Sequence, residues 1–296
     1  MSSRERKRKE SSSPVSRYRE TATRQLRDLI SGVLRDPSYV ERIRILVEEQ
    51  GANPNIVNLA GNTPLMVIIK IWGNKTIDRP YYDFIIRTFQ LLVERADVLV
   101  ADRSGDMAIH VAVLAKNSIF LRILLDDTKI QHNIDIGNQS MGHSAVQMAC
   151  GVSGTPIENI KLLLSAGADP NMQCRIFRRT PLQLLMEVGV LDVTGIDWVI
   201  AVLRVFFDCP TLELGDPTIR DLGGDTLLHT AAREMRSRYV IEMLLDRGEG
   251  ANVGSLNTLG ETPLTIAIKV NNDPAVAALE NYGRKRSFGR GLFGIA

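Results

Sequence analysis

Four histidines and three cysteines are the residues of this chain best suited to acid-base, nucleophilic or metal chemistry. A hydrolase needs a histidine paired with a nucleophile and an orienting carboxylate, and a metal site needs several ligands close together. The spacing of these side chains indicates neither arrangement, and the odd number of cysteines fits free thiols in a reducing compartment. The residues are His110, His132, His143, His229, Cys150, Cys174 and Cys209. We therefore predict no catalytic residue and no metal site.

Motifs for cofactor binding are missing as well. The sequence contains no phosphate-binding Gly-x-x-x-x-Gly-Lys-Ser/Thr loop, no kinase motif set and no paired Cys/His zinc pattern. The glycine-rich stretch 283–294 lacks the strand-turn-helix context of a nucleotide site. We expect no cofactor and no enzymatic activity. The alternative is a concealed enzyme in which His143 is the catalytic group.

The composition indicates a globular protein with a large core of aliphatic residues. Hydrophobic residues make up 44% of the chain and charged residues 24%, whereas aromatic residues make up only 5%. No apolar run reaches the roughly 18 residues that a membrane span needs. Residues 1–10 carry a charge of +3 and residues 284–296 a charge of +4, although the net charge is only +2. The basic character therefore lies in the tails. The free thiols and the lack of an apolar run of membrane length lead us to expect a cytoplasmic or nuclear protein.

One pattern recurs six times along the chain. It is a turn glycine, a polar residue, a residue suited to capping a helix, and a short apolar helix. The capping positions are 36 to 46 residues apart, at Thr63, Met107, Ser144, Thr180, Thr226 and Thr262. Most copies continue into a second apolar segment with a Leu-Leu pair, such as IKLLLSAGADPN at 160–171. The pattern predicts stacked helix-turn-helix units.

The pattern resembles the ankyrin repeat, with its Thr-Pro-Leu-His-x-Ala signature. Pro64, Pro181 and Pro263 match the proline of that signature, and His110 and His229 match its histidine. The resemblance implies an all-α ankyrin-repeat solenoid of about six repeats plus a degenerate N-terminal capping repeat. It also implies that His110 and His229 hydrogen-bond neighbouring turns. The wide spacings predict insertions at 72–80 and 188–195, which form either binding loops or tolerated surface loops.

The pattern divides the chain into four parts. Residues 1–16 are predicted to be a disordered basic tail, and residues 17–57 capping helices or a degenerate repeat. Residues 58–283 are predicted to be the repeat array, and residues 284–296 a basic, glycine-rich disordered tail. Arg4, Arg6, Lys7, Arg8 and Lys9 form a candidate nuclear localisation signal, a nucleic-acid contact or a solvated tail.

The resemblance implies that a partner contacts the concave face of the stack. The contact positions are the turn residues before the cap and the polar residues late in the first helix. They include Leu59, Asn62, Lys70, Arg103, Asp106, Met141, His143, Ile176, Phe177, Arg178, Arg179, Glu187, Leu222, Asp225, Arg233, Leu259, Glu261 and Lys269. The fourth turn is unusual because Arg178 replaces the turn glycine beside Ile176 and Phe177, giving either an interface hot spot or a solvated loop.

The leading hypothesis is a monomeric, non-catalytic module that binds another protein. The runner-up is a nuclear regulator that binds a transcription factor, with basic tails for nuclear import or nucleic-acid contact. Nucleic acid is the less favoured partner, because the basic residues lie in short tails.

Overall fold

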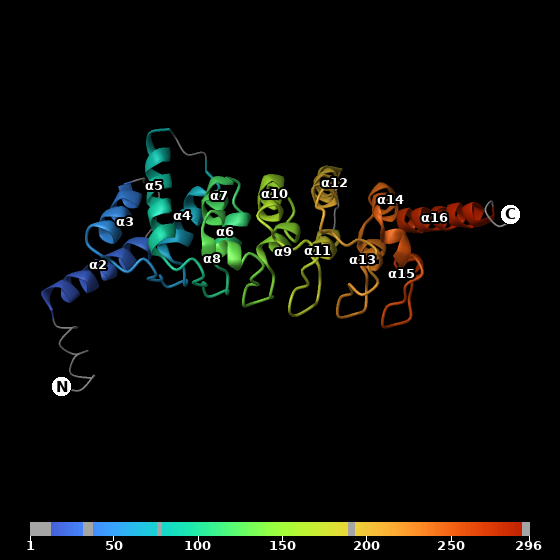
Figure 1. The fold of residues 1–296 in the computed structure, drawn as a ribbon, viewed down its shortest axis with the longest axis horizontal. Coiled ribbons are helices and arrows are strands. Elements are labelled where there is room, and N and C mark those ends of the chain that lie inside the picture. Colours follow the sequence, from blue (N-terminus) through green and yellow to red (C-terminus); the bar gives the residue numbers. More distant parts are fainter. Residues whose placement is uncertain (1–12, 32–37, 76–78, 189–192, 292–296) are drawn as a thin grey trace, which may run out of the picture. The chain divides into compact units, whose positions relative to one another are not determined.

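The computed structural model describes residues 13–31, 38–75, 79–188 and 193–291. These residues form helices and turns, without a β-strand in any of the four ranges. The chain divides into two units. Unit 1 consists of Met1–Ile134 and Asn138–Ser140, and unit 2 of Asp135–Gly137 and Met141–Ala296. Each unit is a stack of helix-turn-helix repeats (Figure 1).

Unit 1 contains the N-terminal helices and the first two repeats. Helix α2 packs on α3, α3 on α5, and the first helices α4 and α6 pack side by side. The second helices α5 and α7 pack beside each other in the same way. The bounds are α2 Pro14–Ser31, α3 Ser38–Glu48, α4 Pro64–Trp72, α5 Arg79–Arg95, α6 Ala108–Val113, α7 Ile119–Leu125 and α8 Thr128–His132.

Unit 2 contains the remaining four repeats. Its first helices form one layer, in which α9 contacts α11, α11 contacts α13 and α13 contacts α15. The second helices form another layer, in which α10 contacts α12 and α14 contacts α16. The bounds are α9 Ala145–Cys150, α10 Ile157–Ser165, α11 Pro181–Glu187, α12 Val193–Phe207, α13 Leu227–Glu234, α14 Arg238–Arg247, the 3₁₀ helix η1 Glu249–Asn252, α15 Pro263–Lys269 and α16 Asp273–Gly291.

The predicted caps begin the first helices. The side chains of Thr63, Ser144, Thr180 and Thr262 each accept a hydrogen bond from the backbone N–H three residues later. Such a bond satisfies one of the donors that a helix start leaves unpaired. Proline follows three of these caps, where its missing N–H costs nothing. The sequence prediction of six short helices that begin at these caps is confirmed.

The core is aliphatic, as the composition predicts. Leu, Ile, Val and Ala supply most of its fully buried side chains. In unit 1, Phe89 and Phe120 pack edge to face with ring centres 4.8 Å apart, an arrangement that aromatic rings favour. No helix among the described residues is long and apolar enough to cross a membrane.

The structure differs from the sequence prediction at the tails and insertions. Helix α2 begins at Pro14 and α16 extends to Gly291, so residues 14–16 and 284–291 are helical where disorder is predicted. An ion pair between Arg284 and Glu280 at 3.1 Å spans the predicted boundary at residue 283 and favours a helix there. Part of each predicted insertion lengthens α5 and α12, which have 17 and 15 residues, rather than forming a loop.

Candidate partner-binding surface

The turns between repeats are closed by their own polar groups. In the first turn, Asn58 N–H donates to the carbonyl of Asn62 at 3.1 Å, and its side-chain oxygen accepts from Ala60 and Asn62. Asn257 makes the equivalent bonds in the sixth turn, where its side-chain oxygen accepts from the N–H groups of Leu259 and Glu261 at 3.0 Å. These bonds satisfy the backbone near the tip, so the side chains at the tip can point into solvent.

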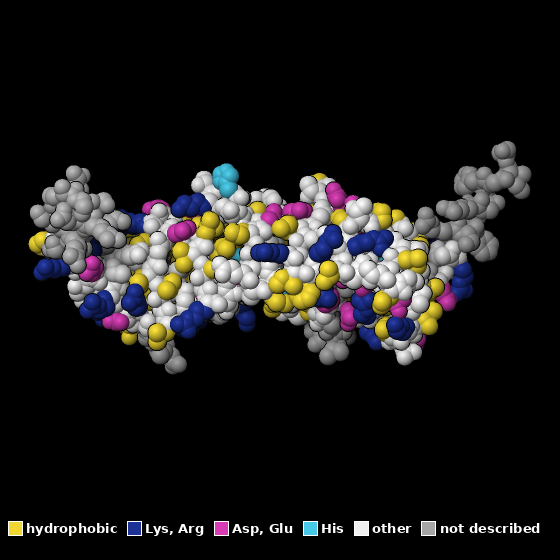
Figure 2. Space-filling model, turned by 90° about the horizontal axis from the view of Figure 1, so that it is seen from below, with side chains coloured by type: hydrophobic (Ala, Val, Ile, Leu, Met, Phe, Trp, Pro, Cys, Tyr) yellow, Lys and Arg dark blue, Asp and Glu magenta, His cyan; other side chains and the backbone are white. Residues whose placement is uncertain are grey.

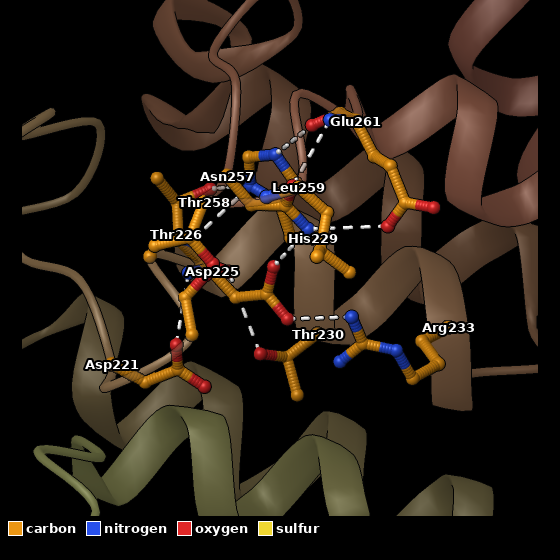
Figure 3. A network of polar contacts seen from close by, with 12 residues as sticks. Asp221, Asp225, Thr226, His229, Thr230, Arg233, Asn257, Thr258, Leu259 and Glu261 are labelled. Atoms are coloured by element: carbon orange, nitrogen blue, oxygen red, sulfur yellow. Dashed lines mark hydrogen bonds and ion pairs between the residues drawn. The ribbon is translucent and has the colours of Figure 1, made fainter.

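One buried side chain in each of three repeats of unit 2, three residues after the cap, joins that cap to a neighbouring turn. His229 shows the arrangement (Figure 3): Nδ1 accepts from Thr226 N–H, and Nε2 lies 3.1 Å from the carbonyls of both Ser255 and Glu261. Because a backbone N–H can only donate, Nδ1 carries no proton and Nε2–H is the donor. Burial lowers the pKa of His229, which favours this neutral form.

Glutamine performs the same role in two repeats. Gln183 accepts from Thr180 N–H at 2.9 Å and donates from Nε2 to the carbonyl of Asp225 at 3.0 Å. Gln147 accepts from Ser144 N–H and donates to the carbonyls of Met172 and Arg179 at 2.8 Å. The structural role that the ankyrin resemblance implies for His229 is confirmed. Gln147 and Gln183 were not among the residues predicted for that role, although their position three residues after a cap is a usable signal.

Several predicted contact residues pair with one another across eight positions of sequence. Arg179 bonds Glu187 at 2.7 Å and Arg233 bonds Asp225 at 2.6 Å. The same relation recurs at two further pairs: Lys70 bonds the side chain of Asn62, and Lys269 bonds Glu261 at 2.8 Å. These pairs connect a turn to the end of the first helix that follows it.

Burial removes two of the predicted contact residues from the surface. Asn62 is 8% exposed, and Asp225, which is 4% exposed, also accepts a bond from Asn257 at 2.9 Å. Their polar atoms serve the turns, so for Asn62 and Asp225 the structure favours a supporting role over direct contact. Asp106, half-buried, likewise accepts from Asn138 at 2.8 Å.

Most exposed members of the predicted set lie at the turn tips, whereas Lys70 and Lys269 are exposed near the ends of α4 and α15. Arg103 and Arg178 are exposed, and His143 and Phe177 are half-buried. Large apolar side chains are exposed at the tips of all four turns of unit 2: Met141 (42%), Ile176 (45%), Leu222 (68%) and Leu259 (75%). Figure 2, which views the turns from below, shows hydrophobic side chains interspersed with Lys and Arg on this face.

Neighbouring tips in unit 2 are joined through their backbones. Leu222 N–H donates to the carbonyl of Phe177 at 3.0 Å, and Thr258 N–H donates to the carbonyl of Gly223 at 3.0 Å. We call Met141, Ile176, Leu222 and Leu259 the tip row. Ile176, Leu222 and Leu259 lie on turns whose backbones are hydrogen-bonded, and exposed apolar side chains that gather on one face mark interaction surfaces.

Comparison with known proteins agrees with the repeat geometry. A family model for the ankyrin repeat matches residues 223–258, which run from the fifth turn to the start of the sixth. The crystal structure of the ankyrin repeat domain of Bcl-3, described as a unique member of the IkappaB protein family, has a similar fold. The TM-score is 0.58 at 23% identity, over 81% of this chain and 91% of that domain. The fold is that of an ankyrin-repeat solenoid, and residues 223–258 match the ankyrin repeat.

The chain also resembles a curated sequence. It is 35% identical over 144 residues to the chicken (Gallus gallus) nuclear factor NF-kappa-B p105 subunit. The match covers 48% of this chain but only 13% of that protein. The chain therefore corresponds to a small part of the length of its relative. The ankyrin fold is generally a non-catalytic interaction module, which agrees with the leading sequence hypothesis.

Two other predictions concern chemistry and the tails. Among the described residues, no group of three or more His, Cys, Asp or Glu side chains could hold a metal ion. Cys150 is fully buried, and burial raises the pKa of its thiol. The candidate localisation signal, Arg4, Arg6, Lys7, Arg8 and Lys9, lies outside the described residues. It therefore stays a prediction.

Proposed function

We propose that this protein is a monomeric, non-catalytic interaction module that binds another protein through the tips of its turns and the adjoining ends of its first helices. The observation that carries the proposal is the tip row, in which every turn of unit 2 exposes a large apolar side chain. An exposed leucine on a turn adds nothing to the core, but it supplies apolar area that a partner can bury.

The lack of catalysis is part of the same proposal. His229 uses both ring nitrogens for contacts within the stack, so it has no nitrogen left for proton transfer to a substrate. The raised pKa of Cys150 and its burial disfavour a reactive thiolate. Both observations support binding over chemistry.

The test is quantitative affinity purification of three versions of the full chain from cell extract. Leu222→Ser and Leu259→Ser together remove two members of the tip row without touching the core. Tyr239→Ser, at a 53% exposed position on α14, is the control. We expect a defined set of proteins to be lost with the tip variant and retained with the control. Identical sets from all three versions would contradict the proposal.

A nuclear role is the second candidate. It is favoured by the 35% sequence identity to part of the protein named nuclear factor NF-kappa-B p105 subunit. The import signal predicted within residues 4–9 also favours it. We propose that the chain is both cytoplasmic and nuclear and binds a transcription factor. Imaging of a fluorescent fusion tests the location: deletion of residues 4–9 should abolish nuclear accumulation, and unchanged accumulation would rule out this signal.

A further inference from the structure

The fourth turn, residues 174–179, keeps an arginine where the backbone favours glycine. The residue two positions before the cap is glycine in the other five turns, with φ between +70° and +83°. In the fourth turn it is Arg178, with φ +55°. A left-handed conformation is strained for a side chain with a Cβ atom, and such strain concentrates at functional positions.

The contacts of Arg178 within the chain do not account for this strain. Its guanidinium is exposed and donates to the side-chain oxygen of Gln173 at 3.3 Å, the long end of the hydrogen-bond range. Glycine would form the turn without strain and would lose only this weak contact. The side chain of Arg178 is therefore better explained by a contact with another molecule.

The charge around Arg178 is positive and incompletely neutralised. Arg179 is paired with Glu187, whereas Arg175 is exposed and makes no ion pair with any described residue. Burial and then the positive charge of Arg179 lower the pKa of His143 in the preceding turn. In the following turn, the carboxylate of Asp225 is held by Arg233. Two arginines at this tip are thus available to an acidic ligand.

Apolar surface lies directly beside these arginines. Ile176 is at the tip of the same turn, and the Leu222 backbone is bonded to Phe177, which brings the fifth tip next to the fourth. The guanidinium of Arg179 lies over the ring of Phe177, 5.2 Å from the ring centre, and forms a cation–π contact within the turn. Arginine is enriched in interface hot spots, and Ile176 and Leu222 beside it supply apolar area that a partner can bury.

We propose that the fourth turn docks a segment of the partner protein that carries a carboxylate side chain next to a large apolar side chain. The carboxylate binds Arg175 and Arg178, for which a guanidinium fork is suited, and the apolar side chain covers Ile176 and Leu222. This inference rests on the proposed function and specifies the partner surface that one turn recognises.

The test uses a library of random twelve-residue peptides displayed on phage and selected on the full chain. We expect enriched peptides to contain Asp or Glu within a few residues of Phe, Leu, Ile or Trp. Selection on Arg175→Glu should not enrich acidic peptides. Enrichment of peptides without acidic residues, or the same acidic peptides on Arg175→Glu, would overturn the proposal, as would a selection that yields no binder.

Arg178→Gly separates binding from folding in the same experiment. It removes the guanidinium and the strained conformation together, so the melting temperature should rise by about 2 °C while the selected peptides bind roughly fivefold or more weakly. Arg204→Ala, at an exposed position of α12, is the matched control and should leave binding unchanged. A more stable Arg178→Gly variant with unchanged affinity would refute the docking site.

Failure of this inference can be told apart from failure of the proposed function. If Leu222→Ser with Leu259→Ser loses cellular partners but Arg175→Glu and Arg178→Gly do not, the tip row binds proteins and the fourth turn is not an acidic-segment site. If none of these variants loses a partner, both conclusions fall.

Discussion

Gln183 donates from its side-chain amide to the backbone carbonyl of Asp225 at 3.0 Å, across 42 positions of sequence. Its side-chain oxygen accepts from Thr180 N–H, so one residue caps its own helix and binds the next turn. Both contacts are buried. The residue at the same position in the next repeat is His229, and the two side chains reach equivalent groups.

Substitution of Gln183 should be costly unless the substitute has a donor and an acceptor. Gln183→Ala leaves the Thr180 N–H and the Asp225 carbonyl unsatisfied in the core, and we expect a loss of about 2–4 kcal/mol. Gln183→His should recover more than half of that loss, because His229 makes the same contacts. Urea unfolding followed by circular dichroism measures both; equal losses for the two variants would contradict this role.

His229 should make the stability of the chain depend on pH. Its folded-state pKa lies below the ordinary value of 6.5, so the unfolded chain binds a proton more readily. The stabilisation is therefore complete above pH 6.5 and is lost as the pH falls through the folded pKa. His229→Gln should remove this loss, since glutamine makes these contacts in a neighbouring repeat and does not titrate.

The measurement is the free energy of unfolding at several pH values between 7.5 and 5 for both proteins. Glu249 also contributes to the pH dependence of both proteins. Burial raises the pKa of Glu249, so its contribution to stability is lost in the opposite direction, as the pH rises. The difference between wild type and His229→Gln cancels that effect. A difference that does not change with pH would refute the role of His229.

Asp225 should contribute more to stability than its partner Arg233. The Asp225 side chain is 6% exposed and binds both Arg233 and the amide of Asn257, whereas the Arg233 side chain is 35% exposed. We expect Asp225→Ala to cost about 2–3 kcal/mol, because it leaves a buried donor unpaired, and Arg233→Ala to cost less than about 1 kcal/mol. Thermal unfolding of both variants tests the order, and the reverse order would contradict it.

Two turn glycines with the same backbone should respond differently to alanine. Gly224 and Gly260 have φ of +76° and +72°. A Cβ atom at Gly224 would lie 2.9 Å from the backbone nitrogen of Thr258, but at Gly260 it would meet no atom within 4 Å. Gly260→Ala should lower the free energy of unfolding by about 1 kcal/mol, from the backbone conformation alone. Gly224→Ala should lower it by clearly more, because its Cβ atom also meets the next turn. Equal costs would show that the neighbouring turn moves freely.

The local signals in the sequence were enough to predict most of the fold. A capping Thr or Ser, the proline after it and the turn glycine before it depend on neighbouring residues alone, so each could be recognised within one repeat. Helical propensity at the ends was harder to judge. The predicted array ends at residue 283, yet α16 continues to Gly291.

The candidate site was predicted less completely, because it depends on contacts between repeats. The sequence placed Asn62 and Asp225 at the turns but did not indicate that both are buried. Asp225 is also bound by Asn257, which lies 32 residues later in the next turn. The exposed leucines Leu222 and Leu259 follow directly from the turn register and were anticipated. Arg178 could be recognised as a missing glycine, but its φ required coordinates.

Three buried side chains of unit 2, Gln147, Gln183 and His229, point the same way along the chain. Gln147 reaches the fourth turn, Gln183 the fifth and His229 the sixth, so each donor finds its acceptor in a repeat that comes later in the sequence. During synthesis, each repeat leaves the ribosome with a donor that has no acceptor until the following turn is made. Each of these three contacts therefore forms only when the next repeat is present.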